Sequence, residues 1–207
     1  MEVIRSLNYS FHLIFHPFDG FWDLKHEKRG NLKAAIAIVL MLCVTYILRR
    51  QLTGFLFNGA NLLRLNIFIE FTSVLIPFIL WCVANWCLTT LMDGEGSFRD
   101  IIITTAYALA PLVIINIPLI LFSNVITSQE GAFYYFFDSL SVIWTGSLIV
   151  LGTMVVHQYS LAKTILTSIC IVIGMGLIIF IALLFFSLLQ QMISFVYIIV
   201  QEFTLRL

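Results

Sequence analysis

Residues 164–201 read TILTSICIVIGMGLIIFIALLFFSLLQQMISFVYIIVQ, and this long run without a charged side chain decides the fold class. An α-helix rises about 1.5 Å per residue, so about 20 apolar residues cross the roughly 30 Å hydrocarbon core of a bilayer. Four more runs without charged side chains precede it, at residues 34–48, 71–92, 101–129 and 139–162. The sequence therefore predicts an all-α integral membrane protein, a bundle of five transmembrane helices.

The composition agrees with a membrane environment. Of all residues 61% are hydrophobic and only 11% are charged, whereas about 25% are charged in an ordinary soluble domain. The 11 basic and 11 acidic residues give a net charge of zero, and the basic residues are scattered, which argues against a nucleic-acid partner because phosphate neutralisation needs a basic patch. Cys43, Cys82, Cys87 and Cys170 all lie in apolar runs without CxxC spacing, which predicts reduced, buried thiols.

An amphipathic helix is predicted before the first span. Apolar residues recur there at steps of three and four, at Val3, Ile4, Leu7, Phe11, Ile14, Phe15 and Phe18. Such a helix either lies in the membrane interface or packs on the spans. We expect Pro17 to end it, residues 19–31 to form a charged elbow, and Asn31 to cap the first span. The charges in residues 1–30 also argue against a cleavable signal peptide.

The chain divides into three predicted regions: residues 1–31, an interfacial or cytoplasmic segment; residues 32–191, the five-span domain; and residues 192–207, an apolar C-terminal tail helix. The last charge-free run is too long for one upright span. We expect it to leave the hydrocarbon core near Ser187, Gln190 and Gln191, although the apolar residues 193–200 allow a sixth span as an alternative.

The distribution of Lys and Arg predicts that the N-terminus is cytoplasmic. In that orientation the inner side holds most of the cations, at Arg5, Lys25, Lys28, Arg29, Lys33, Arg99 and Lys163. The outer side holds Arg49, Arg50, Arg64 and Arg206. Glu70 and Asp138 end their spans on the outer side, so they either pair with these arginines or face water.

The segment predicted to contact partners is the cytoplasmic hairpin between the second and third spans: Asp93, Gly94, Glu95, Gly96, Ser97, Phe98, Arg99 and Asp100. Its glycines can supply the positive φ of a tight turn, and the Ser97–Asp100 spacing predicts a helix cap. Asp93, Glu95 and Ser97 alternate as in a calcium loop, but Phe98 and Thr104 replace the required Gly and Glu. We therefore expect a structured hairpin and no metal.

Residues for catalysis are not clustered in the sequence. His12 and His16 have a metal-ligand spacing without a third ligand, and Ser139, Ser141 and Ser147 of the fourth span do not show the flanking pattern of a nucleophile. We expect no enzyme activity and no cofactor. Helix kinks and close packing are instead predicted at Tyr107, Pro111 and Pro118 in the third span and at Gly174 and Gly176 in the fifth.

Several short motifs, in this order and spacing, resemble the Yip-type integral membrane domain family, named for Ypt-interacting proteins, and more nearly its bacterial branch. They are His16-Pro17-Phe18, residues 27–30 (EKRG), residues 93–98 (DGEGSF) and residues 106–111 (AYALAP). The resemblance implies five spans, a cytoplasmic N-terminus, a bacterial plasma membrane location and no established catalytic activity. Eukaryotic members act in vesicle traffic with small GTPases. This sequence lacks their long Pro-rich N-terminal region, which argues against a GTPase partner.

These observations predict an accessory or scaffold subunit of a membrane complex. Its expected partners are the lipid bilayer and other membrane proteins, either ABC-transporter components, which some bacterial relatives accompany, or a second copy of the chain. A small-solute carrier or channel subunit is the alternative. Five spans cannot divide into two equal inverted halves, which disfavours the carrier.

Overall fold

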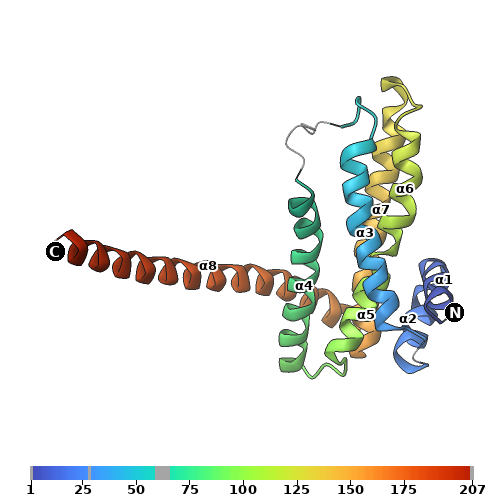
Figure 1. Ribbon diagram of the computed structural model, residues 1–207. Helices are drawn as coiled ribbons and strands as arrows, with labels where there is room; N and C mark the ends of the chain where they lie inside the picture. Colours follow the sequence, from blue (N-terminus) through green and yellow to red (C-terminus); the bar gives the residue numbers. More distant parts are fainter. Residues whose placement is uncertain (1, 28, 59–65, 206–207) are drawn as a thin grey trace.

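The computed structural model describes residues 2–27, 29–58 and 66–205. The secondary structure of these residues is helical (Figure 1). The elements are α1 (Glu2–Phe15), α2 (Pro17–His26), α3 (Leu32–Leu52), α4 (Ile67–Leu91), α5 (Phe98–Ala108), α6 (Ala110–Phe122), η2 (Ser128–Glu130), α7 (Gly131–His157) and α8 (Leu161–Leu205). Five stretches among them are long and apolar enough to cross a membrane: Leu32–Leu52, Ile67–Leu91, Phe98–Phe122, Ser128–His157 and Leu161–Glu202. The predicted all-α membrane fold is confirmed.

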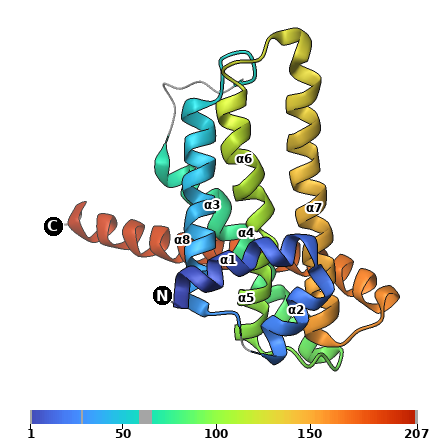
Figure 2. The same ribbon diagram turned by 90° about the vertical axis from the view of Figure 1, so that its right-hand side faces the viewer.

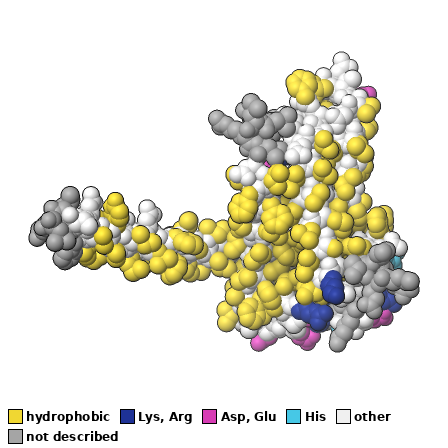
Figure 3. All heavy atoms as spheres, in the orientation of Figure 1, with side chains coloured by type: hydrophobic (Ala, Val, Ile, Leu, Met, Phe, Trp, Pro, Cys, Tyr) yellow, Lys and Arg dark blue, Asp and Glu magenta, His cyan; other side chains and the backbone are white. Residues whose placement is uncertain are grey.

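The helices α3, α6 and α7 stand side by side, with α6 contacting both of the others, and α4 packs on α3 and α5 (Figure 1). Helix α1 crosses in front of α3 and α6 (Figure 2), and α2 packs against α7. The core lies where these elements meet, around fully buried Leu13 and Phe21 from the N-terminal helices and Ile38, Tyr107 and Leu148 from the spans. Charged side chains gather at the lower end of the bundle, and apolar side chains cover its flanks (Figure 3).

The N-terminal segment contains a second helix that the sequence did not predict. The expected elbow over residues 19–31 is wrong for its first half, because α2 runs from Pro17 to His26. Proline is favourable in the first turn of a helix, where its missing N–H has no partner to lose. Phe21 is fully buried and Leu24 nearly so, and they hold this charged helix on the bundle. Asn31 caps α3 as predicted, accepting from the Lys33 N–H at 3.0 Å.

The face that α1 buries differs from the predicted stripe. Leu13, Ser6 and Ser10 are buried, whereas Phe11 is 50% and Phe15 76% exposed. The side chains of Val3 and Ile4 lie outside the described part of the structure. Helix α1 therefore lies across the spans and packs on them through a mixed face, leaving its phenylalanines outside the core.

The third span is interrupted at Leu109, two residues before Pro111. The Leu109 N–H reaches the carbonyls of Thr105 and Ala106 at 3.2 Å each, which closes α5. Proline has no N–H to continue the ladder, so α6 begins a new helix with Pro111 in its first turn. Helix α6 continues through Pro118 without a break.

Helix α8 is a single helix of 45 residues that projects sideways from the bundle (Figure 1). Its first turns pack against α4, and Thr164, Thr167 and Ile171 are buried there. The helix has no break at Ser187–Gln191, so residues 192–205 continue the helix of the fifth span and are not a separate tail helix. Its apolar side chains beyond the bundle are exposed all round.

Candidate functional site

The candidate site is the hairpin between α4 and α5 together with the turn between α7 and α8. The hairpin begins where the Gly94 N–H donates to the Thr89 carbonyl at 2.8 Å. It ends in a capping box, in which the Ser97 N–H donates to the Asp100 carboxylate at 3.1 Å and the Asp100 N–H donates to Ser97 Oγ at 3.3 Å. The predicted helix cap at Ser97 and Asp100 is thus confirmed.

The role predicted for the hairpin glycines is wrong. Asp93 carries the positive φ, 57°, and none of the described glycines has a positive φ. Gly94 and Gly96 are needed instead because the hairpin lies against the end of α7. A Cβ on Gly94 would lie 2.6 Å from His157 Nδ1, and a Cβ on Gly96 would lie 2.7 Å from His157 Cε1 and clash with Val156 Cγ1. The glycines therefore permit close packing, which fixes the position of the hairpin against the end of α7.

The hairpin packs mainly against His157. It is the last residue of α7 and is 1% exposed. Its Nδ1 accepts a hydrogen bond from the Gly96 N–H at 3.3 Å, which places the ring proton on Nε2. The buried Nε2 has no partner in the described part of the chain. The ring also stacks on Tyr159, with centroids 5.5 Å apart.

The turn after α7 holds the hairpin from the other side. Tyr159 donates its hydroxyl hydrogen to the Met92 carbonyl at 3.0 Å, and Lys163 Nζ donates to the same carbonyl at 2.8 Å. The Lys163 ammonium also lies 4.1 Å from the centre of the Tyr159 ring, a cation–π contact. Burial, and then the charge of Asp93, raise the pKa of Tyr159 above its usual value.

Asp93, Glu95 and Arg99 are exposed on this seated hairpin. Glu95 reaches Lys25 of α2 at 3.2 Å, so the hairpin and the N-terminal segment form one charged face. Beside it Trp86 and Phe98 are partly exposed, with ring centroids 5.6 Å apart. We call Asp93, Glu95, Phe98 and Arg99 the hairpin face.

Sequence reasoning missed Lys25, His157, Tyr159 and Lys163 as parts of this site. His157 and Lys163 flank the end of one apolar run and the start of the next, which placed them near the hairpin's side of the membrane. No spacing in the sequence, however, links them to residues some 60 to 70 positions earlier in the chain. The sequence shows a histidine at the end of a span, but this observation alone does not predict which residue the histidine contacts.

The N-terminal helices are fastened to the bundle by a buried hydroxyl pair. Tyr107 is fully buried, and its hydroxyl lies 2.5 Å from Ser6 Oγ and donates to the Ser6 carbonyl at 3.1 Å. Ser6 Oγ in turn donates to the Arg29 carbonyl at 3.0 Å. Nearby, Tyr9 donates to the Asp23 carboxylate at 2.8 Å. Burial, and then this hydrogen bond, raise the pKa of Tyr9 above its usual value.

The opposite end of the bundle carries the ion pairs that were one of two predicted alternatives. Arg49 forms a bidentate pair with Asp138 at 2.8 and 2.9 Å and also donates to the buried Asn116 at 3.2 Å. Arg50 pairs with Glu70 at 3.0 Å. Arg64 lies outside the described residues. The pairs join α3 to α7 and α3 to α4, and the Arg49–Asp138 pair has a planar, charge-assisted bidentate geometry.

The remaining singled-out residues are dispersed. The rings of His12 and His16 are 4.9 Å apart, and the described residues contain no group of three or more His, Cys, Asp or Glu suited to a metal. The cysteines are free; Cys43 and Cys82 are buried, but Cys87 is exposed, so its predicted burial is wrong. A Cβ on Gly174 would lie 3.2 Å from Leu88 of α4, whereas Gly176 has no such neighbour within 4 Å.

Comparison with known proteins decides the family. The Yip1 domain matches residues 11–184, which include the hairpin and the start of α8. The chain belongs to the Yip1 domain family. No curated protein and no solved structure matches it. The Yip1 domain thus covers every element from the end of α1 to the middle of α8, and the chain is a multi-pass integral membrane protein.

Proposed function

We propose that this Yip1-domain protein is a non-catalytic accessory or scaffold subunit of a membrane complex, and that the hairpin face is its partner contact. The observation that carries the proposal is the seating of the hairpin on His157, Tyr159 and Lys163. A loop that is fixed by close glycine packing presents its exposed side chains in one arrangement. Preorganisation of this kind lowers the entropy cost of binding.

The charges of the hairpin face suit a partner with basic side chains. Asp93 and Glu95 are exposed, and Glu95, whose side chain is 66% exposed, makes a single contact with the largely buried Lys25, so this pair contributes little to stability. Their charges are therefore available for recognition at small cost to folding. The proposed partners are ABC-transporter components or a second copy of the chain, in a bacterial plasma membrane with the N-terminus and hairpin in the cytoplasm.

The rival proposal is a small-solute carrier or channel subunit. A cavity of about 280 Å³ lies between α4 and the rest of the bundle, bordered by the polar side chains of Tyr46, Ser73 and Trp81. A second hollow of about 370 Å³ lies beyond Trp81 toward α8. The walls of both spaces are mainly apolar, but the spaces are the observation that supports this rival, which is tested by the same experiment.

The test is co-purification from mild detergent of the variant Asp93→Asn/Glu95→Gln, with Asp19→Asn, an exposed acid of α2, as the matched control. We expect both variants to accumulate as the native protein does, and only the hairpin variant to lose its partners. If the hairpin variant keeps every partner, the scaffold proposal is wrong. If it also changes solute uptake into vesicles, the carrier takes its place.

A further inference from the structure

The part of α8 that projects from the bundle carries a line of polar and small side chains. Among residues 175–201, every serine and every glutamine except Gln191 lies on one line of alternating steps of three and four residues. The line consists of Gly176, Phe180, Leu183, Ser187, Gln190, Ser194, Tyr197 and Gln201. This spacing places them on one face of a helix, at the two contact positions of a heptad. We call these residues the α8 seam.

The α8 seam faces away from the bundle. A Cβ on Gly174 would lie 3.2 Å from Leu88 of α4, whereas a Cβ on Gly176 would meet nothing within 4 Å. Each residue turns an α-helix by about 100°, so Gly176 points almost opposite to Gly174. Because α4 stands upright beside α8, the seam points sideways along the membrane, on the side away from α4 (Figure 1).

The seam lies at the depth of the spans. Helix α8 leaves the bundle beside Ala84 and Leu88 of the span Ile67–Leu91, and along its length it stays between the two ends of α4 in height (Figure 1). The side chains of Ser187, Gln190 and Ser194 are exposed and make no hydrogen bond within the described part of the chain. Lipid chains offer none, and a polar group without a partner is costly in hydrocarbon. These side chains therefore need partners on another helix.

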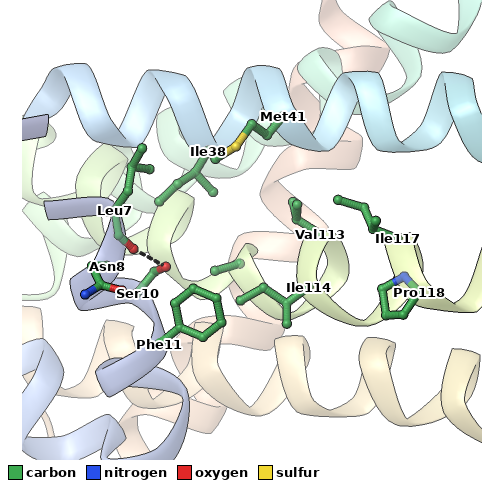
Figure 4. Close-up of a pocket in the computed structure, with 11 residues that line it drawn as sticks. Leu7, Asn8, Ser10, Phe11, Ile38, Met41, Val113, Ile114, Ile117 and Pro118 are labelled. Atoms are coloured by element: carbon green, nitrogen blue, oxygen red, sulfur yellow. Dashed lines mark hydrogen bonds between the residues drawn. The ribbon is translucent and has the colours of Figure 1, made fainter. Parts of the chain in front are cut away.

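Purely apolar surfaces of the bundle make no such demand. A groove of about 980 Å³ where α1 crosses α3 and α6 is lined mainly by apolar side chains, among them Ile38 and Ile114 (Figure 4). Lipid tails are as apolar as protein side chains, so such a groove does not select its occupant. The amides and hydroxyls of the α8 seam do select one, because they require donors and acceptors.

The direction of α8 limits how two copies of the chain can pair through it. Copies that insert into the membrane in the same orientation and form a closed dimer are related by a two-fold axis along the spans. Rotation about this axis keeps the spans parallel and reverses a helix that lies across them. Two α8 helices that meet at their seams therefore run antiparallel.

The α8 seam is complementary to itself in this arrangement. In a two-fold pair, a residue that contacts a second position of the other copy is contacted there in return. When Ser187 lies opposite Gln190 of the other copy, the same register brings three more pairs together: Leu183 with Ser194, Phe180 with Tyr197, and Gly176 with Gln201. Each Gln190 amide then meets a hydroxyl, two aromatic rings meet, and glycine leaves room for a long amide side chain.

We propose that the α8 seam binds a second copy of this chain as an antiparallel helix pair, with Ser187–Gln190 hydrogen bonds at its centre. From Gly176 to Gln201 the overlap is about 38 Å long by the helical rise. The hollow of about 370 Å³ bordered by Val172, one turn before Gly176, leaves room on this side of the bundle for the second helix. The hydroxyls and amides of the seam lie beyond residue 184, where the Yip1 domain match ends. The proposal does not rest on the partner contact of the hairpin.

The register is tested by disulfide cross-linking in membrane vesicles. Two differently tagged copies without the native cysteines are co-expressed, one with Leu183→Cys and the other with Ser194→Cys, and then oxidised. We expect a linked dimer that carries both tags. Either variant alone should stay unlinked, because equal positions lie about 16 Å apart along an antiparallel pair, too far for a disulfide. The matched control is Ile181→Cys with Val196→Cys, which has the same spacing on the opposite face and is 56% and 54% exposed.

Three outcomes would overturn the pairing. Linking of Leu183→Cys to itself means a parallel pair, and equal linking of the control pair means random collision. Absence of a link between Leu183→Cys and Ser194→Cys means that the seams do not meet. All four positions are exposed, so the substitutions do not open the buried core.

The hydrogen bonds are tested by Förster transfer between labelled copies in vesicles over a range of protein-to-lipid ratios. Gln190→Leu removes both central hydrogen bonds and should weaken the dimer roughly tenfold. Gln191→Leu, the same change beside the seam, should weaken it by less than about threefold. Equal dimer strength in the native protein and Gln190→Leu would contradict the proposal.

The same measurement separates this dimer from the hairpin contact. Asp93→Asn/Glu95→Gln should keep the full Förster transfer, whether or not it loses other partners. Loss of transfer in that variant would mean that the hairpin holds the second copy, and the assignment to α8 would be wrong.

Discussion

Replacing Gly96 with Ala should destabilise the protein although it adds only one methyl group. Because Gly96 has no positive φ, the alanine backbone fits without strain, and any cost must come from packing. The new Cβ would clash with Val156 Cγ1 and lie 2.7 Å from His157 Cε1, and both side chains are 1% exposed. Inserting a methyl group into a filled core costs about 1–3 kcal/mol.

The matched control is Gly146→Ala on α7, where a Cβ meets no atom within 4 Å. There the higher helix propensity of alanine should stabilise by about 0.5–1 kcal/mol. Thermal unfolding in detergent measures both variants in a background with Cys87 and Cys170 replaced by Ser, followed by a thiol-reactive dye that reports exposure of the buried Cys43 and Cys82. Each kcal/mol shifts the midpoint by about 2–4 °C in a chain of this size.

A second substitution identifies the cause. Val156→Ala removes the Cγ1 atom that the new methyl group would strike, so it should cost less in the Gly96→Ala background than in the native protein. If Gly96→Ala is as stable as Gly146→Ala, or if the two changes near His157 are simply additive, the close seating of the hairpin is wrong.

Three further changes test other contacts. Arg49→Ala removes the bidentate pair with Asp138 and the hydrogen bond to buried Asn116, and should cost on the order of 1–3 kcal/mol, against about 1 kcal/mol for Arg50→Ala, which loses a single contact with Glu70, when the unfolding midpoints are compared. Tyr107→Phe removes the hydroxyl that ties α5 to α1 and should cost about 1 kcal/mol, and limited proteolysis should cut the N-terminal helices faster. Since the pKa of Tyr159 is raised in the folded state, its contribution to the stability should be fully present below about pH 10 and be lost as the pH rises above that value. Tyr159→Phe should lessen this loss in thermal scans between about pH 8 and 11.

The spans could be predicted because apolar runs without charge have few alternatives in a membrane. The hairpin was predictable for a similar reason, as the Ser97–Asp100 cap is a local pattern. Other features depend on distant contacts. Helix α2 looks like a charged linker until Phe21 and Leu24 are seen to be buried against α7 and its neighbours.

The glycines of the hairpin show the same limit. Their number and spacing suggest conformational freedom, and the positive φ nevertheless falls on Asp93. The glycines are needed instead because His157 lies too close for a Cβ, and this residue is 61 positions away from Gly96 and leaves no trace in the local sequence. The direction of α8 is likewise set by its contact with α4, since an evenly apolar helix carries no pattern that favours one neighbour.

Because α8 projects sideways from the bundle as one long helix, a small change of its tilt gives a large displacement of its far end. Its first turns pack against α4 as far as Gly174. The turn before them is fixed by the hydrogen bonds of Tyr159 and Lys163 to the hairpin. The helix beyond Gly174, to Leu205, is about 45 Å long at 1.5 Å per residue, so a tilt of about 10° at the base moves its tip by roughly 8 Å. A tilt of this size at the base would thus displace the far end of α8 by nearly the width of a helix.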